Sequence, residues 1–206
     1  NSVYYYQKEK DGETYSENLD DKEIEKQGKS MASEILSRLR ANEDLKDIPI
    51  HFAIYKQSGQ DSISPGSFIA QTTADDGQTT INHWKSINEK TVLLPSDDAD
   101  KLNETLNNNF KQFNNNLQSY FTNFTQAAGK VKFVDKKPRQ LTVDLPIDYY
   151  GQAETIAITQ YVTEQANKYF DNIDSYEIRI KDGNTSRALI SKSKDDKEPQ
   201  VHIYNN

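Results

Sequence analysis

The sequence predicts an α+β fold in which two similar halves are joined by one long amphipathic helix. Three observations support this fold class. Residues 141–190 run as strand, helix, strand and hairpin, residues 97–128 keep a helical apolar spacing, and the order helix, strand, strand, strand occurs twice. The halves, each a helix with antiparallel strands, are expected at about 1–95 and 129–206, with the bridging helix at about 97–128.

The first half begins with a β-prone segment, Val3–Tyr6, and the polar run Gln7–Asn18 is interpreted as a loop. Asp20 and Glu23 resemble a capping box at the start of a helix over residues 21–41. Five apolar or small positions spaced by three or four residues predict one buried stripe on this helix: Ile24, Gly28, Met31, Ile35 and Leu39. Strands are expected next at Ile48–Tyr55, Ser67–Thr73 and Thr91–Leu94.

The long helix is expected to begin after Ser96 and to end near Gly129. Its other face is rich in Asn, a poor helix former, so packing must hold it in place. We expect four of its apolar side chains to be buried against both halves: Phe110, Phe113, Leu117 and Phe121.

The second half contains the clearest pattern. Leu141–Leu145 alternates apolar and polar residues, and Pro146 ends the strand because it has no N–H to donate. Ala153–Phe170 is expected to be a helix and Tyr176–Ile180 the next strand. Asp182-Gly183 then turns the chain into Arg187–Ile190, and Val201–Tyr204 is the last predicted strand.

Burial of the apolar face predicts the register of the two strands joined by Asp182-Gly183. A two-residue Asp182-Gly183 loop would place Arg187 on the apolar face, whereas a three-residue loop pairs Ile178 with Ala188. The second register sets Arg179 opposite Arg187 on the outer face. Because like charges in register repel each other, we expect an anion between the two arginines, either a protein carboxylate or a ligand's phosphate or carboxylate.

Composition narrows the function. Only 34% of the residues are hydrophobic and the mean hydropathy is −0.92, so we expect a folded chain with a thin core. The 25 basic and 32 acidic residues give a net charge of −7, which argues against nucleic-acid binding. Five basic residues around Asp135 are interpreted as a solvated strand edge: Lys130, Lys132, Lys136, Lys137 and Arg139.

No residue pattern predicts a catalytic site, a metal site or a cofactor. The chain has no Cys, and its three histidines are far apart and lack metal-binding spacing. There is also no Gly-rich phosphate loop and no nucleophile elbow. No apolar run approaches the ~18 residues of a membrane span, and no signal peptide opens the sequence.

One junction is a candidate ligand-binding surface. Asp144, Asp148, Tyr149 and Tyr150 gather where the strand ending at Pro146 meets the following helix. The alternative interpretation is structural, because Asp148 can cap the helix and the tyrosines can pack on its first turn. A pocket joining these side chains to Trp84 or a histidine would favour a binding or catalytic site.

Three segments together resemble the CamS family of sex pheromone precursor lipoproteins from staphylococci and related Gram-positive bacteria. They are residues 144–154, Arg187-Ala-Leu-Ile190, and the ending Lys197-Glu-Pro-Gln-Val-His-Ile-Tyr204. The resemblance covers nearly the whole chain and corresponds to the C-terminal part of the family's mature protein. It implies tandem repeated domains and an exported lipoprotein, anchored through a lipidated Cys upstream of Asn1. In this family the pheromone peptide comes from the signal sequence, so the resemblance assigns no catalytic residue here.

Two functional hypotheses follow. The favoured one is a non-enzymatic, monomeric extracytoplasmic domain that binds a cell-envelope or protein partner and touches the membrane only through the lipid anchor. The alternative is a small-ligand-binding protein or hydrolase with a cleft at residues 144–154.

Overall fold

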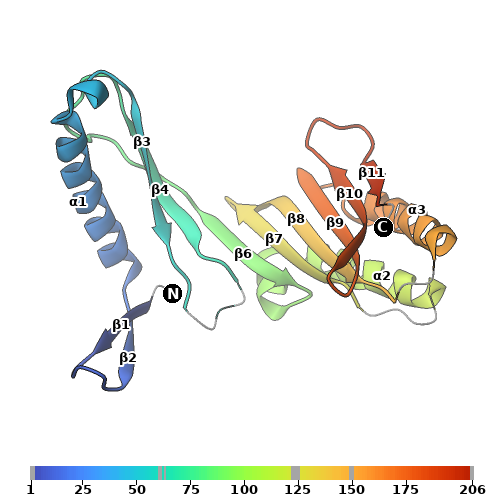
Figure 1. Cartoon of the computed structure of the whole chain (residues 1–206). Coiled ribbons are helices and arrows are strands. Elements are labelled where there is room, and N and C mark those ends of the chain that lie inside the picture. Colours follow the sequence, from blue (N-terminus) through green and yellow to red (C-terminus); the bar gives the residue numbers. More distant parts are fainter. Residues whose placement is uncertain (1–2, 60–61, 63, 122–125, 149–150, 205–206) are drawn as a thin grey trace. The chain divides into compact units, whose positions relative to one another are not determined.

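The computed structural model describes residues 3–59, 62, 64–121, 126–148 and 151–204, and confirms the α+β class (Figure 1). The chain divides into two compact units, an N-terminal unit of residues 1–89 and a C-terminal unit of residues 90–206.

The N-terminal unit combines a hairpin, a helix and a small sheet. Strands β1 (Val3–Gln7) and β2 (Thr14–Asn18) pair antiparallel, so the predicted loop over residues 7–18 is confined to residues 8–13 and the prediction is wrong for β2. Helix α1 (Asp21–Arg40) and a short 3₁₀ turn, η1 (Glu43–Leu45), follow. The sheet then has the order β3–β4–β5 and is antiparallel throughout: β3 (Ile50–Lys56), β4 (Ser67–Ala74) and β5 (Lys85–Ser86).

Helix α1 buries only part of the predicted stripe: Ile24, Gly28 and Leu39 are half-buried, but Met31 and Ile35 are not buried. Ala32 and Leu36 are its buried residues, whereas Met31 is 60% exposed and Ile35 is 43% exposed. Gly28 is the point of close approach, because a Cβ at this position would lie 2.9 Å from Cγ2 of Ile54 on β3. The helix therefore approaches the sheet through small residues, with Leu36 filling the space beyond them.

The capping box is also wrong. Asp20 is the N-cap residue of α1, but its side chain makes no capping hydrogen bond. The backbone N–H groups of Glu23 and Ile24 donate to the Asp20 carbonyl instead.

The C-terminal unit is a six-stranded sheet with two helices. The sheet order is β11–β10–β9–β8–β7–β6. The pairs β11–β10, β10–β9 and β8–β7 are antiparallel, whereas β8 and β9 are parallel, with α3 as the crossover between them. The elements are β6 (Glu89–Leu94), α2 (Asp97–Tyr120), β7 (Ala128–Val134), β8 (Lys137–Pro146), α3 (Gln152–Tyr169), β9 (Ser175–Asp182), β10 (Thr185–Lys192) and β11 (Gln200–Ile203). Both helices lie on one face of the sheet (Figure 1) and contribute to its core.

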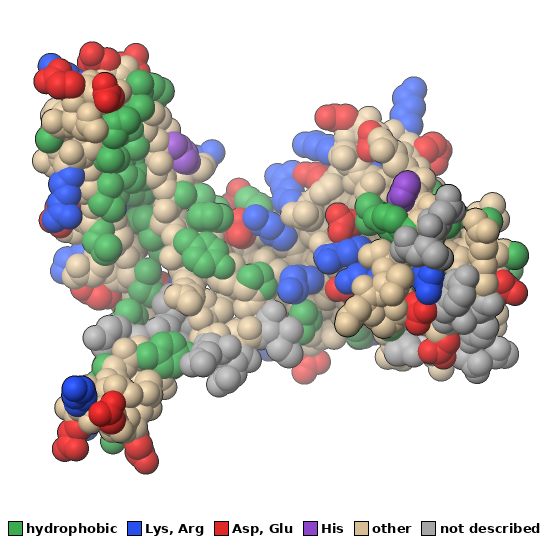
Figure 2. Space-filling model, in the orientation of Figure 1, with side chains coloured by type: hydrophobic (Ala, Val, Ile, Leu, Met, Phe, Trp, Pro, Cys, Tyr) green, Lys and Arg blue, Asp and Glu red, His purple; other side chains and the backbone are tan. Residues whose placement is uncertain are grey.

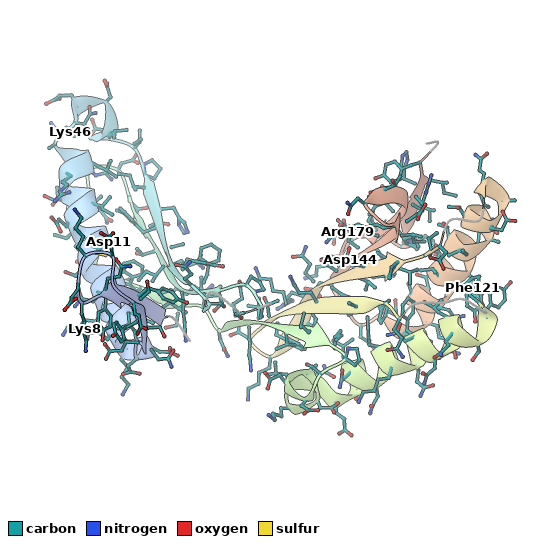
Figure 3. All side chains as sticks on the ribbon, turned by 60° about the horizontal axis from the view of Figure 1, so that its bottom comes forward. Lys8, Asp11, Lys46, Phe121, Asp144 and Arg179 are labelled. Atoms are coloured by element: carbon teal, nitrogen blue, oxygen red, sulfur yellow. The ribbon has the colours of Figure 1, made fainter. Side chains whose placement is uncertain are left out.

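Helix α2 contributes much of the core of this unit. Phe110, Phe113 and Leu117 are fully buried as predicted, and Phe121 is partly buried at the C-terminal end of the helix (Figure 3). Strand β6, which the sequence assigned to the first half, adds Val92 and Leu94 to the same core. Helix α2 and β6 thus belong to one unit, and the similarity of two halves stays a prediction.

The ends of α2 differ from the expectation. Asn103 leaves helical geometry, with φ of −161° and ψ of 88°, and its Oδ1 accepts from Leu106 N at 2.9 Å, so the helix is capped a second time after Ser96. Gly129 does not end the helix but lies in β7. A Cβ there would approach Cε2 of Phe110 to 2.7 Å, so the core requires glycine at this position.

The predicted hairpin register is wrong, although the predicted buried face is right. The turn is Gly183-Asn184, with Gly183 at φ of +55° in the first central position, as in a type II′ turn. A bulge at Arg187 then shifts the pairing to Ile180–Ala188 and Ile178–Ile190. Arg179 therefore lies opposite Leu189, so the pairing of Arg179 with Arg187 from which an anion was expected does not occur.

Candidate functional site

The residues proposed at the strand-to-helix junction are not all brought together. Asp144 is an exposed residue of β8, and Asp148 is exposed beyond the end of that strand. Tyr149 and Tyr150 lie outside the described residues. The structure therefore gives no side-chain geometry for half of the proposed junction site.

Asp144 instead belongs to a charged cluster across β8 and β9. Its Oδ1 lies 3.1 Å from Lys181 Nζ and 3.6 Å from Arg179 Nε, and Arg179 Nε lies 3.0 Å from Glu177 Oε1. Figure 3 shows Asp144 and Arg179 on neighbouring strands, and Figure 2 shows acidic and basic side chains mixed over this part of the sheet. The two cations are balanced by two carboxylates, so the cluster carries little net charge to attract a ligand.

Arg187 is held separately from this cluster. Its Nη2 donates to Asp182 Oδ2 at 3.0 Å across the hairpin end, and its carbonyl accepts from Tyr204 N. Protein carboxylates thus accompany both arginines, but not at a shared site.

One of the basic residues near Asp135, Arg139, forms an ion pair with a carboxylate. Arg139 Nη1 donates to Asp174 Oδ2 at 2.6 Å, and this hydrogen bond lowers the pKa of Asp174 below its usual value. The pair connects the start of β8 to the segment before β9.

A different site occurs in the N-terminal unit, where an open hollow of about 400 Å³ lies against the small sheet. Its volume is in the range of small-molecule pockets, about 300–1,000 Å³. Its lining residues are His51, Gln71, Thr72, Thr73, His83, Trp84 and Lys85. None of these described residues belongs to the junction predicted from the sequence.

Strand pairing positions the polar groups of the hollow. His51 on β3 is in register with Thr73 on β4, and His51 Nδ1 lies 2.9 Å from Thr73 Oγ1. Gln71 is in register with Lys85 on β5. Thr72 Oγ1 donates to the His83 carbonyl at 2.5 Å, which fastens the segment before β5 to β4.

An aromatic pair lies on the same strands as the hollow. His51 and Tyr55 alternate onto the same side of β3. The Tyr55 ring makes an edge contact with Phe68, with centroids 5.2 Å apart, and both side chains are exposed. This side of β3 and β4 thus combines aromatic, imidazole and hydroxyl groups.

Sequence reasoning missed this site for a physical reason. The sequence shows three scattered histidines without metal-binding spacing, and it offers Trp84 only as a possible partner of the junction. Residues 51, 71 and 84 share no local motif, and only the register of three strands brings them together. The available signal was the single Trp of the chain beside a His and a Lys.

The described residues supply neither a metal-binding cluster nor a membrane helix. Nowhere among them do three His, Asp or Glu side chains gather as a metal site would require. No helix in the described part of the chain combines the length and apolarity needed to cross a bilayer.

Comparison with known proteins identifies relatives over the whole chain. A family model described as CamS sex pheromone cAM373 precursor matches residues 1–198. The C-terminal domain of the sex pheromone staph-cAM373 precursor from Staphylococcus aureus is 74% identical, with a TM-score of 0.93 over 100% of this chain and 62% of that chain. A sex pheromone precursor from Lactobacillus salivarius is 25% identical, with a TM-score of 0.86 over 100% of this chain and 60% of that chain.

A third structure, a sex pheromone staph-cAM373 precursor at 22% identity, shows likeness of fold alone, with a TM-score of 0.58 over 98% of this chain and 74% of that chain. The comparison with curated proteins finds no match. This chain spans about three fifths of the first two structures' chains. The match over residues 1–198 and the 74% identity show that the chain belongs to the family of CamS sex pheromone cAM373 precursors.

Proposed function

We propose that this chain is a non-enzymatic, extracytoplasmic binding module that engages the cell envelope. Membership of a sex pheromone precursor family suggests an extracytoplasmic placement. Anchoring through an N-terminal lipid, action as a monomer and recognition of an envelope partner are parts of this proposal.

The observation that carries the proposal is the open hollow on β3, β4 and β5. Its side chains are those of recognition sites: one indole, two imidazoles, hydroxyls, an amide and an ammonium group. His51 faces a threonine hydroxyl at hydrogen-bond distance rather than a carboxylate that would orient it as a base. The arrangement suits holding a polar ligand better than transforming one.

The alternative, a hydrolase or small-ligand-binding protein acting at residues 144–154, has less support. Asp144 is engaged by Lys181 and Arg179, so its carboxylate is compensated by two cations rather than available as a base.

Co-sedimentation with purified staphylococcal cell envelopes tests the proposal. The folded chain is expected to pellet with the envelopes in a saturable manner, whereas a control protein of similar size and net charge stays in the supernatant. Equal amounts of both proteins in the pellet, or none of either, would contradict an envelope-binding function.

A further inference from the structure

We propose that the hollow lined by β3, β4, β5 and residues 83–84 binds an acidic saccharide, a pyranose ring carrying a carboxylate. This inference rests on the proposed function, because it names the envelope chemistry that the module recognises.

Charge favours an anion at this site. The chain as a whole carries seven more acidic than basic residues. The described lining of the hollow nevertheless contains Lys85, and none of its residues is Asp or Glu. The exposed Lys85 ammonium can form a charge-assisted hydrogen bond with a carboxylate, which is stronger than a bond between neutral groups.

The aromatic surface favours a ring. Trp84 is partly exposed and offers an indole, on whose face the C–H groups of a pyranose can pack. Lys29 Nζ of α1 lies over the Trp84 ring, 5.9 Å from the ring centroid. The same Nζ forms an ion pair with Glu25 Oε1 at 2.5 Å. This cation–π contact orients the ring and occupies one of its faces, so a pyranose packs on the opposite face.

The polar groups favour hydroxyls over an apolar ligand. Gln71 offers two amide donors and a carbonyl acceptor, while Thr73 and His51 can each donate or accept. Sugar hydroxyls also do both, so they can satisfy these groups in either sense. A purely apolar ligand would leave them unpaired.

The site is rigid on its β5 side. Gln71–Lys85 and Ala70–Ser86 pair β4 with β5, and Ile87 N donates to the Ile69 carbonyl at 2.8 Å. Together with the Thr72–His83 hydrogen bond, these contacts hold Trp84 and Lys85 in place. A preformed site avoids the entropy cost of ordering its side chains on binding.

Trp84 is the sole Trp of the chain, so its fluorescence reports on the hollow directly. N-acetylmuramic acid and N-acetylglucosamine are the probes, because they differ by the carboxylate-bearing lactyl group. We expect a saturable Trp84 response to N-acetylmuramic acid at about tenfold lower concentration than to N-acetylglucosamine, equivalent to about 1.4 kcal/mol. Equal responses to both sugars, or no response to either, would overturn the inference.

Lys85→Met tests the carboxylate contact, and Lys101→Met, whose side chain is 76% exposed in the C-terminal unit, is the matched control. Lys85→Met is expected to reduce the affinity for N-acetylmuramic acid to that for N-acetylglucosamine, while binding of the neutral sugar is unchanged. Lys101→Met should change neither. If both variants behave alike, Lys85 does not contact the ligand and the assignment fails. Circular dichroism of each variant checks that it is folded.

The two proposals fail in different ways. Envelope retention of the wild-type chain without any Trp84 response to the sugars would leave the binding module standing and reject the saccharide site. A selective Trp84 response without envelope retention would support the saccharide site and reject the envelope-binding function.

Discussion

Phe113 stabilises the core of the C-terminal unit. It is fully buried on α2, with ring centroids 4.9 Å from Phe170 and 6.0 Å from Phe110. Phe113→Ala is expected to lower the free energy of unfolding by about 3–5 kcal/mol, because it removes apolar contacts and leaves a cavity. Chemical denaturation measures this change, with exposed Gln112→Ala as the control. An unchanged midpoint for Phe113→Ala would show that the ring is not packed as described.

Gly28 tests the packing of α1. A Cβ here would lie 2.9 Å from Cγ2 of Ile54, so Gly28→Val should overpack the contact and destabilise the N-terminal unit by about 1–3 kcal/mol. Ser37→Val, at an exposed position of the same helix, controls for the helix propensity of valine. Thermal unfolding compares the two variants. Equal stability would mean that α1 does not approach β3 at Gly28.

Tyr176 gives a pH dependence at the residue scale. Burial, with smaller contributions from Glu198 and Asp171, raises the pKa of Tyr176 to about 12. Above about pH 10 the unfolded chain loses this proton while the folded chain keeps it, so stability is lost as pH rises toward 12, by up to about 2.7 kcal/mol. Below pH 10 this contribution is fully present.

Denaturation at pH 9 to 12 checks the Tyr176 prediction. The wild-type chain should lose stability more steeply than Tyr176→Phe, which cannot ionise at this position. Tyr120→Phe, at a residue that is 59% exposed, should follow the wild type. Parallel slopes for the wild type and Tyr176→Phe would assign the alkaline loss to other groups.

At the scale of the element, α2 is held by buried amides as well as by its apolar stripe. Asn114 is 4% exposed, its Oδ1 accepts from Ala127 N at 2.9 Å, and its Nδ2 donates to the Ala127 carbonyl at 3.2 Å. This pair of bonds attaches the helix to the chain entering β7. Asn107 makes comparable bonds to Ser96 and Asp100 at the start of the helix.

Asn114→Ala should therefore lower the free energy of unfolding by much more than its small change in side-chain volume suggests. It leaves the buried N–H and C=O of Ala127 unpaired, at about 1–3 kcal/mol for each group. Asn115→Ala, at an exposed neighbour on the same helix, should be close to neutral or slightly stabilising. Urea denaturation of the two variants measures the difference, and similar midpoints would rule out the buried double hydrogen bond.

At the scale of the whole molecule, the two units have cores of different depth. In the described part of the N-terminal unit the buried apolar residues are few, and three of the five are alanines: Ala32, Leu36, Ile54, Ala70 and Ala74. The C-terminal unit buries a continuous cluster that includes four aromatic rings. Phe110 and Phe113 come from α2, Phe170 follows α3, and Tyr176 lies on β9. Depth of burial sets how often a region opens.

Hydrogen exchange should follow this difference. Amides of β8 and β9 are expected to exchange more slowly than those of β3 and β4, because opening the larger core exposes more apolar surface. Peptide-level exchange measured by mass spectrometry checks the order. Slower exchange in β3 and β4 would contradict the thin-core description of the N-terminal unit.

The sequence alone determined the elements whose signal is local. Alternation in Leu141–Leu145 and Tyr176–Ile180, and helical spacing through Phe110, Phe113 and Leu117, gave the α+β class and three fully buried side chains. The resemblance to the CamS family, carried by residues 144–154, 187–190 and 197–204 together, is confirmed by the family model over residues 1–198. These features depend on the spacing of apolar residues along a helix or strand. That spacing can be read from the sequence without knowing which element packs against it.

Only the tertiary structure decided the face of α1, the hairpin register and the candidate site. Gly28 is the point of close approach because Ile54 lies against it, 26 residues later. Gly183 occupies the first central position of the turn, and a bulge follows at Arg187. Together they give pairings between β9 and β10 that differ from those predicted, although the sequence of the two residues is compatible with either register. The hollow joins His51, Gln71 and Trp84, which become neighbours only when three strands pair. Side chains that depend on long-range pairing leave no local pattern in the sequence, and this is why the site became visible only in the fold.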